Sequence, residues 1–188
     1  MPALLYYVAD LAVGFGLPLV VTGLAVGPLR ATSVAQLYWL GVALGLTWEL
    51  PIFWSALASP TPLIQFVVPP PVHPSVLFVS HTLWDGGLFL AGMVIVAAIR
   101  GTDAARHPGA PELALLLAWG QLSALLVELS SVVCGGWAYD PTHRWNGSLF
   151  ELRGESITLL PQLIWLAAPF AYWILVRWVF RERVCSEP

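Results

Sequence analysis

Long apolar runs, broken only by short loops, dominate the pattern of the chain. Five of them are long enough to cross a bilayer as helices. They cover approximately residues 3–26, 35–58, 76–99, 113–134 and 157–180. The loops between them begin at helix-ending pairs, namely Gly27-Pro28, Ser59-Pro60, Arg100-Gly101 and Cys134-Gly135. The pattern therefore predicts an all-α integral membrane fold, a bundle of five transmembrane helices that forms a single domain over residues 1–188.

The composition supports a membrane protein and excludes other classes. The 188 residues are 58% hydrophobic and only 10% charged, which fits neither an ordinary soluble domain nor a disordered chain. The net charge is −3 and the chain contains no lysine, so that a nucleic-acid partner is excluded. We expect the protein in the endoplasmic reticulum if it is eukaryotic and in the inner membrane if it is bacterial.

The arginines predict the orientation of the chain. One set of loops, together with the C-terminal tail, carries Arg30, Arg100, Arg106, Arg177, Arg181 and Arg183. The other side carries only Arg144 and Arg153. Because cytoplasmic loops are enriched in basic residues, the C-terminus is predicted to be cytoplasmic.

Tryptophans near the span ends are typical of an interfacial belt. The set comprises Trp39, Trp137, Trp145, Trp173 and Trp178. The polar loop from Gly135 to Glu155 lies on the non-cytoplasmic side, where it either connects two spans or caps a cavity. It contains a weak glycosylation signal, Asn146-Gly147-Ser148.

Six polar residues of the spans share one depth. With a rise of about 1.5 Å per residue, all lie within roughly 7–14 Å of the non-cytoplasmic boundary. They are Asp10, Glu49, His81, Asp85, Glu128 and Gln162. This layer predicts a polar pocket in the non-cytoplasmic half. His81 and Asp85, four residues apart on one helix face, either belong to that pocket or satisfy each other as a structural pair.

The layer supplies candidate catalytic residues, namely Glu49, Asp85, His81 and Glu128. Burial favours the protonated form of a carboxyl group, which suits a general acid that protonates an alkene or an epoxide. A second carboxylate or a histidine could then remove a proton from the neighbouring carbon. Asp10, near a helix start, is expected to be structural or interfacial. Gly45, one turn before Glu49, leaves room on the same face.

Candidate substrate-binding residues surround this layer. They are Trp48, Trp84, Gln121, Gln162 and Trp165. Trp54 is expected to add a further aromatic wall. Aromatic faces attract positive charge, so such walls suit an apolar ligand or a developing carbocation.

Short motifs lie in the fourth and fifth spans, namely Gly120-Gln121 and the run from Gln162 through Trp165 to Pro169. They resemble the Gly-Gln and the Asn-x-x-Trp-x-x-x-Pro of the EXPERA family of sterol isomerases and sigma-2-type receptors. Glu49 matches the glutamate of its His-x-x-x-Glu motif. The chain departs from the family at that histidine, which is Gly45 here, and at the asparagine, which is Gln162. The third-helix glutamate has no clear counterpart, and His81 lies nearest to it.

The pairs Trp48-Glu49 and Asp85-Gly86 carry a second resemblance. Trp48-Glu49 looks like the Trp-Glu motif of the fungal membrane-bound meroterpenoid cyclases, whose glutamate protonates an epoxide or an olefin, and Asp85-Gly86 is similar to the Asp-Gly of their last helix. Those cyclases have seven spans, so this chain would be a shortened relative. Both resemblances imply that Glu49 acts as an acid.

Together these observations predict a membrane-embedded isomerase or cyclase that protonates and deprotonates a sterol- or isoprenoid-like lipophilic substrate. The alternative is a non-catalytic protein that binds sterol or lipid. No cofactor is implied, and no metal is expected because paired Glu-x-x-His motifs are lacking. The expected partners are the lipophilic small molecule and membrane lipid, and a homodimer is left open.

Overall fold

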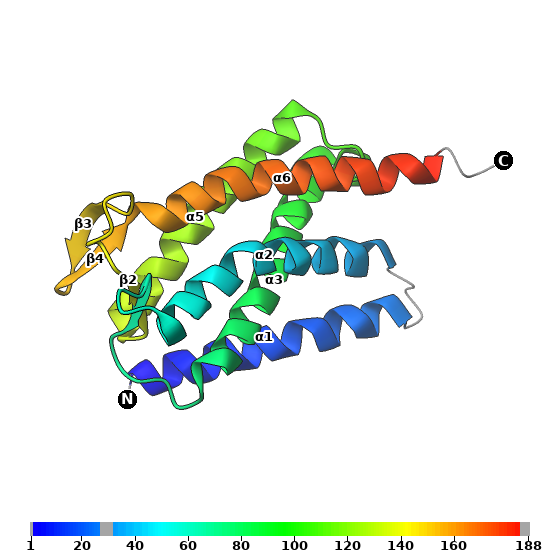
Figure 1. The fold of residues 1–188 in the computed structure, drawn as a ribbon. Helices are drawn as coiled ribbons and strands as arrows, with labels where there is room; N and C mark the ends of the chain where they lie inside the picture. Colours follow the sequence, from blue (N-terminus) through cyan, green and yellow to red (C-terminus); the bar gives the residue numbers. More distant parts are fainter. Residues whose placement is uncertain (1, 27–31, 185–188) are drawn as a thin grey trace.

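Five long helices form the framework of the computed structural model (Figure 1), which describes residues 2–26 and 32–184. They are α1 (Pro2–Val26), α2 (Thr32–Ala58), α3 (Pro74–Arg100), α5 (Ala110–Cys134) and α6 (Leu159–Val184). Each is long and apolar enough to span a membrane. The prediction of an all-α membrane bundle of five helices is therefore confirmed.

Short elements close the two ends of the bundle. The helix α4 (Thr102–Arg106) connects α3 to α5 at one end. At the other end β1 (Ile64–Phe66) pairs antiparallel with β2 (Trp137–Tyr139), and β3 (Ser148–Leu152) pairs with β4 (Glu155–Thr158). The first pair places Ile64 opposite Tyr139, so it joins the loop after α2 to the loop after α5. We call this side the strand-bearing end.

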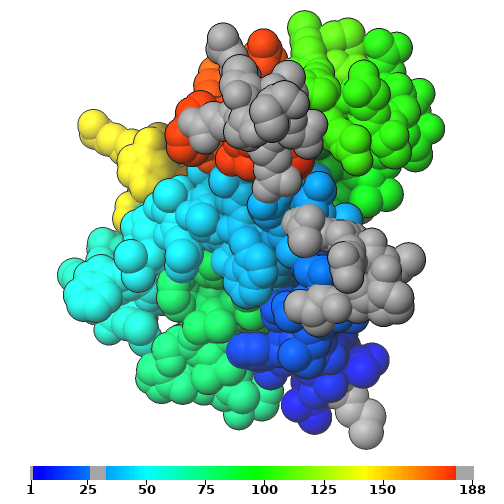
Figure 2. Space-filling model, turned by 90° about the vertical axis from the view of Figure 1, so that its right-hand side faces the viewer, coloured from blue at the N-terminus to red at the C-terminus, as the bar shows by residue number. Residues whose placement is uncertain are grey.

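The helix α3 lies inside the bundle and packs against α1, α2 and α5, while α6 packs on α5 and α2. From the side, α2 is seen between α1 and α6 (Figure 2). Small residues permit this close packing. A Cβ atom on Gly86 of α3 would lie 2.5 Å from Cγ2 of Val42 and 2.9 Å from the carbonyl oxygen of Tyr38, both on α2. Glycine at such contacts lets helix backbones approach closely in a membrane.

The described arginines separate as the sequence predicts. Arg100 ends α3 and Arg106 ends α4. Arg177 lies near the end of α6, whose Trp173 indole donates to the Gly109 carbonyl, just before α5, at 3.0 Å. Arg144 and Arg153 belong to the strand-bearing end. Arg30 lies outside the described residues, as do the side chains of Arg181 and Arg183.

The loop at the strand-bearing end differs from its prediction in two respects. Trp137 is only 4% exposed, so its assignment to an interfacial belt is wrong, whereas Trp39, Trp145 and Trp178 are exposed. Asn146 is fully buried, and its amide donates to the Asp140 carbonyl while accepting from the Leu160 amide at 2.7 Å. Asn146 thus caps the start of α6, and the folded protein leaves no room for a glycan on it.

Candidate functional site

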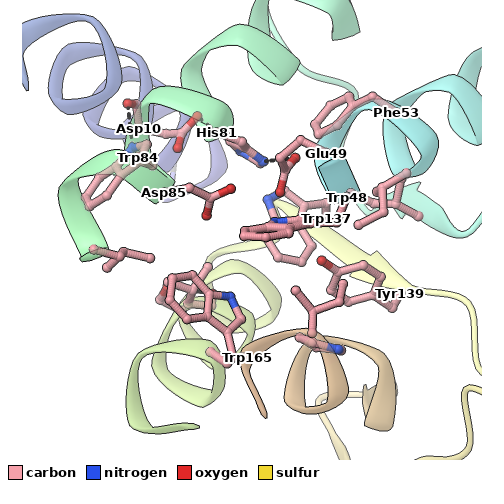
Figure 3. Close-up of a pocket in the computed structure, with 18 of the residues that line it drawn as sticks. Asp10, Trp48, Glu49, Phe53, His81, Trp84, Asp85, Trp137, Tyr139 and Trp165 are labelled. Atoms are coloured by element: carbon pink, nitrogen blue, oxygen red, sulfur yellow. Dashed lines mark hydrogen bonds and ion pairs between the residues drawn. The ribbon is translucent and has the colours of Figure 1, made fainter. Parts of the chain in front are cut away.

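A cavity of about 260 Å³ opens among the helices near the strand-bearing end (Figure 3). All five long helices contribute side chains to it, as do β1 and β2. Its polar lining includes Asp10, Glu49, His81 and Asp85. Its aromatic lining includes Trp48, Phe53, Trp84, Trp137, Tyr139 and Trp165. Four of the six residues of the predicted layer therefore meet at one pocket.

His81 joins two carboxyl groups from different helices. Its Nε2 lies 3.4 Å from Oδ2 of Asp10 on α1, and its Nδ1 lies 4.0 Å from Oε2 of Glu49 on α2. The ring packs edge-on against Phe53 at 5.3 Å between centroids. His81 therefore pairs with Asp10 and Glu49, and the interpretation of His81 and Asp85 as a self-sufficient pair is wrong.

Asp10 is held in place through its backbone. Its carbonyl oxygen accepts hydrogen bonds from the Ser80 hydroxyl at 3.1 Å and from the Trp84 indole at 2.9 Å, both on α3. The side chain is then free to face His81. Asp10 was expected to be structural or interfacial, but the structure places its carboxyl group in the pocket.

Three carboxyl oxygens of the pocket have no hydrogen-bond partner among the described residues, namely Oδ2 of Asp10, Oε2 of Glu49 and Oδ2 of Asp85. The Asp10 atom lies 3.4 Å from Nε2 of His81, whereas the Glu49 atom is 4.0 Å from Nδ1, which is too far for a hydrogen bond. A buried polar atom without a partner costs free energy, so its presence calls for an explanation. All three atoms belong to residues that line the cavity, where a bound molecule could supply the missing contact.

Gly45 determines where Asp85 can lie. A Cβ atom at position 45 would be 2.6 Å from Oδ2 and 2.7 Å from Cβ of Asp85. Real Cβ contacts are not this short, so a larger residue would displace the aspartate. The expectation that Gly45 leaves room on the Glu49 face is met, and Asp85 uses that room.

Aromatic rings form the walls around these acids. Trp48 and Trp165 meet edge to face at 6.2 Å, and Trp165 stacks on Phe89 at 5.0 Å. Trp84 lines the pocket as predicted. The expected role of Trp54 is wrong, because that side chain is 67% exposed on the outer surface of α2 and does not line the cavity.

Three predicted site residues lie elsewhere. Glu128 is fully buried, and its Oε1 accepts from the Thr158 amide at 2.9 Å and the Thr158 hydroxyl at 3.0 Å. Gln121 donates to the carbonyl of Gln162 at 3.0 Å and so links α5 to α6. Neither these glutamines nor Glu128 line the cavity. The side chains of Gln121 and Glu128 connect α5 to α6 and to β4, whereas Gln162 contributes its backbone carbonyl to this contact. Glu128 and Gln162 nevertheless share the depth of the pocket.

Two residues of the lining come from β2, where no site was predicted. Trp137 and Tyr139 alternate with Ala138 on the strand and both contribute to the pocket. Ser131 fixes the start of this strand, since its hydroxyl both donates to the Trp137 carbonyl and accepts from the Trp137 amide at 2.7 Å. Two signals in the sequence point to these residues. One is the alternative that the polar loop between the fourth and fifth spans caps a cavity, and the other is the pair of aromatic residues shortly after Gly135-Gly136.

The pocket reaches the outer surface of the bundle between α1 and α5. Ala9 and Val13 of α1 and Ser130 of α5 line the cavity and are also exposed. In a membrane this surface faces lipid. A ligand could therefore enter from the bilayer without crossing an aqueous phase.

Chemically, the site combines proton-carrying groups with an apolar interior. Within residues 2–26 and 32–184, no three His, Cys, Asp or Glu side chains converge in a way that could hold a metal ion. Carboxyl groups, a histidine and aromatic walls are the groups required to deliver a proton to an apolar molecule and to shield the resulting charge. No protein-family model matches this chain, and comparisons with the curated proteins and with the solved structures found no match.

Proposed function

We propose that the protein is a membrane-embedded isomerase or cyclase that acts by protonation and deprotonation on a sterol- or isoprenoid-like substrate. One observation carries the proposal. Unpartnered carboxyl oxygens of Glu49 and Asp85 are buried in an apolar cavity with aromatic walls. Water-poor surroundings favour the protonated form of a carboxyl group, and a protonated carboxyl can act as a general acid.

The proposed reaction begins when Glu49 or Asp85 donates a proton to a double bond or an epoxide oxygen of the substrate. A carbon atom then becomes positively charged, and the faces of Trp48 and Trp165 stabilise it. The reaction ends when a carboxylate or His81 accepts a proton from a neighbouring carbon. One proton enters and one leaves, so no oxidant or cofactor is needed.

His81 is suited to restore the starting state. It lies between Glu49 and Asp10, and imidazole can accept a proton on one nitrogen while releasing one from the other. Asp10 would take up the proton that the substrate releases, and His81 would accept a proton from Asp10 at Nε2 while releasing one from Nδ1 to Glu49, so that Glu49 regains the proton it donated. In this proposal Asp10 is the third member of the proton-handling group.

The location and orientation are part of the same proposal. The five candidate spans make this an integral membrane protein. We place its C-terminus in the cytoplasm because of the arginine distribution, and the pocket consequently in the opposite half of the membrane.

Isotope incorporation in deuterated water tests the chemistry. We expect wild-type protein in membranes to convert its substrate, recovered from co-purified lipids by mass spectrometry, with deuterium placed on carbon or oxygen. Glu49→Gln and Asp85→Asn should each keep the fold, and at least one should lower turnover by about 100-fold or more. Glu151→Gln and Asp103→Asn are matched controls, because both residues are exposed and do not line the pocket.

Two outcomes would contradict the proposal in different ways. Unchanged turnover in both pocket variants would reject these acids as proton donors. Recovery of a lipid that wild-type protein binds and never alters would instead support the alternative, a non-catalytic sterol- or lipid-binding protein.

A further inference from the structure

Tyr139 presents a hydroxyl group to the pocket from outside the helical bundle. Its strand β2 is fixed by pairing with β1, where Ile64 lies directly opposite. The ring packs edge to face on Trp137 at 5.2 Å and is only 8% exposed. Its position is therefore set by the strand pair and not by a flexible loop.

The hydroxyl of Tyr139 points into the cavity, toward the side that carries Glu49 and Asp85 (Figure 3). It forms no hydrogen bond with any residue that the structure describes. Burial, together with the charges of Glu49, Glu128 and Asp85, raises the pKa of Tyr139 well above its ordinary value. The phenol therefore keeps its proton and remains a hydrogen-bond donor at any physiological pH.

The opposite wall offers complementary groups. Oε2 of Glu49 and Oδ2 of Asp85 are buried without donors. On the strand that carries Tyr139, the indole N–H of Trp137 is a second donor without an acceptor. Donors and acceptors thus face one another across a space that no described side chain fills. A ligand atom that both accepts and donates a hydrogen bond would satisfy both walls at once.

We infer that the pocket selects lipophilic ligands with one hydroxyl group, which accepts a hydrogen bond from Tyr139 and donates one to Glu49 or Asp85. This inference rests on the proposed role of the pocket in ligand binding. The apolar remainder of the ligand packs against Trp48 and Trp165. A hydrocarbon of the same size leaves the donor and the acceptors unpaired. Tyr139 is then the residue that determines specificity for the hydroxyl.

A matched pair of probes tests this selectivity. We would measure binding of 1-decanol and n-undecane, which have equal numbers of heavy atoms, to the full chain in lipid nanodiscs. Relative to the concentration of each probe in the membrane, wild-type protein should bind the alcohol about 100-fold more tightly than undecane, which corresponds to two buried hydrogen bonds. Tyr139→Phe removes one of these bonds, so it should lower the preference to about tenfold and leave the affinity for undecane within about twofold of the wild-type value.

Tyr38→Phe is the control. Tyr38 donates to the Leu83 carbonyl at 3.1 Å and does not line the pocket, so this variant should keep the wild-type preference for the alcohol. Comparing variants with wild type cancels any difference in how the two probes enter the membrane. Thermal unfolding of each variant verifies that it is folded.

The inference is overturned if wild-type protein does not prefer the alcohol, or if Tyr139→Phe keeps the full wild-type preference. Either result leaves the proton chemistry to be judged by the Glu49 and Asp85 variants. Loss of turnover in those variants with an unchanged preference in Tyr139→Phe would reject the role of Tyr139 alone.

Discussion

At the residue scale, three acids and a histidine share a small volume because small neighbours make room for them. Gly45 is the clearest case, since Asp85 occupies the space that a side chain at position 45 would need. The location of Asp85 therefore depends on a residue with no functional group. Glycine at this position is required by packing against α3.

Gly45→Ala should displace Asp85 and destabilise the protein by about 1–3 kcal/mol, since overpacking a tight contact strains both helices. Thermal unfolding in one fixed detergent measures this effect. Gly16→Ala on α1 is the control, because no atom lies within 4 Å of the added Cβ. Equal melting temperatures for Gly45→Ala and wild type would show that Asp85 does not lie against α2.

The sequence predicted how deep each polar residue lies along its helix, but it did not predict toward which neighbour the side chain points. Counting residues from the span ends grouped Glu49, His81 and Asp85 at one level, and they do meet at one pocket. The same count included Glu128, whose side chain points to Thr158. Tyr139 could not be found this way, because its position depends on strand pairing between distant loops.

At the element scale, Glu128 attaches the strand-bearing end to the helical bundle. Its carboxylate satisfies both the backbone and the side chain of Thr158, the last residue of β4 before α6 begins. Asn146 supports the same junction through the Leu160 amide. The start of α6 is thus held by side chains from two separate segments.

Glu128→Ala should lower the free energy of unfolding by about 1–3 kcal/mol, because it leaves the buried Thr158 amide without an acceptor. Glu128→Gln keeps an acceptor oxygen and should cost less. Chemical or thermal unfolding measures both variants, with Glu151→Gln as an exposed control. If Glu128→Ala kept full stability and lost turnover, Glu128 would be catalytic, as its depth in the sequence suggested.

The helices were predictable and the strands were not, for a physical reason. Apolar runs of spanning length leave a strong signal, and the last span was expected at residues 157–180 where α6 extends over Leu159–Val184. The strands contain three to five residues each, too few for an alternating pattern to stand out. Their pairing depends on which loops the helices bring together.

At the scale of the whole molecule, charge distinguishes the two ends. Among the described residues, Arg100, Arg106 and Arg177 belong to the end with α4, and Arg144 and Arg153 to the strand-bearing end. The first set continues in the sequence with Arg181 and Arg183. By the positive-inside rule, this asymmetry predicts that the end with α4 and the C-terminus face the cytoplasm.

A reporter fused to the C-terminus should report a cytoplasmic location. In bacteria, a C-terminal green fluorescent protein should fluoresce and a C-terminal alkaline phosphatase should be inactive. The matched fusions placed after Arg144, in the loop at the strand-bearing end, should give the reverse result. An active phosphatase at the C-terminus would invert the proposed orientation and place the pocket in the cytoplasmic half.

Ala9, Val13 and Ser130 line the cavity and also face outward, at the opening between α1 and α5. This opening affects how the occupancy of the pocket by a ligand must be expressed. A molecule that arrives sideways from the hydrocarbon is supplied in proportion to its abundance per lipid. Diluting the vesicles with buffer would then leave saturation unchanged, while adding empty lipid would reduce it. Affinities for this protein are therefore best stated as mole fractions in the bilayer.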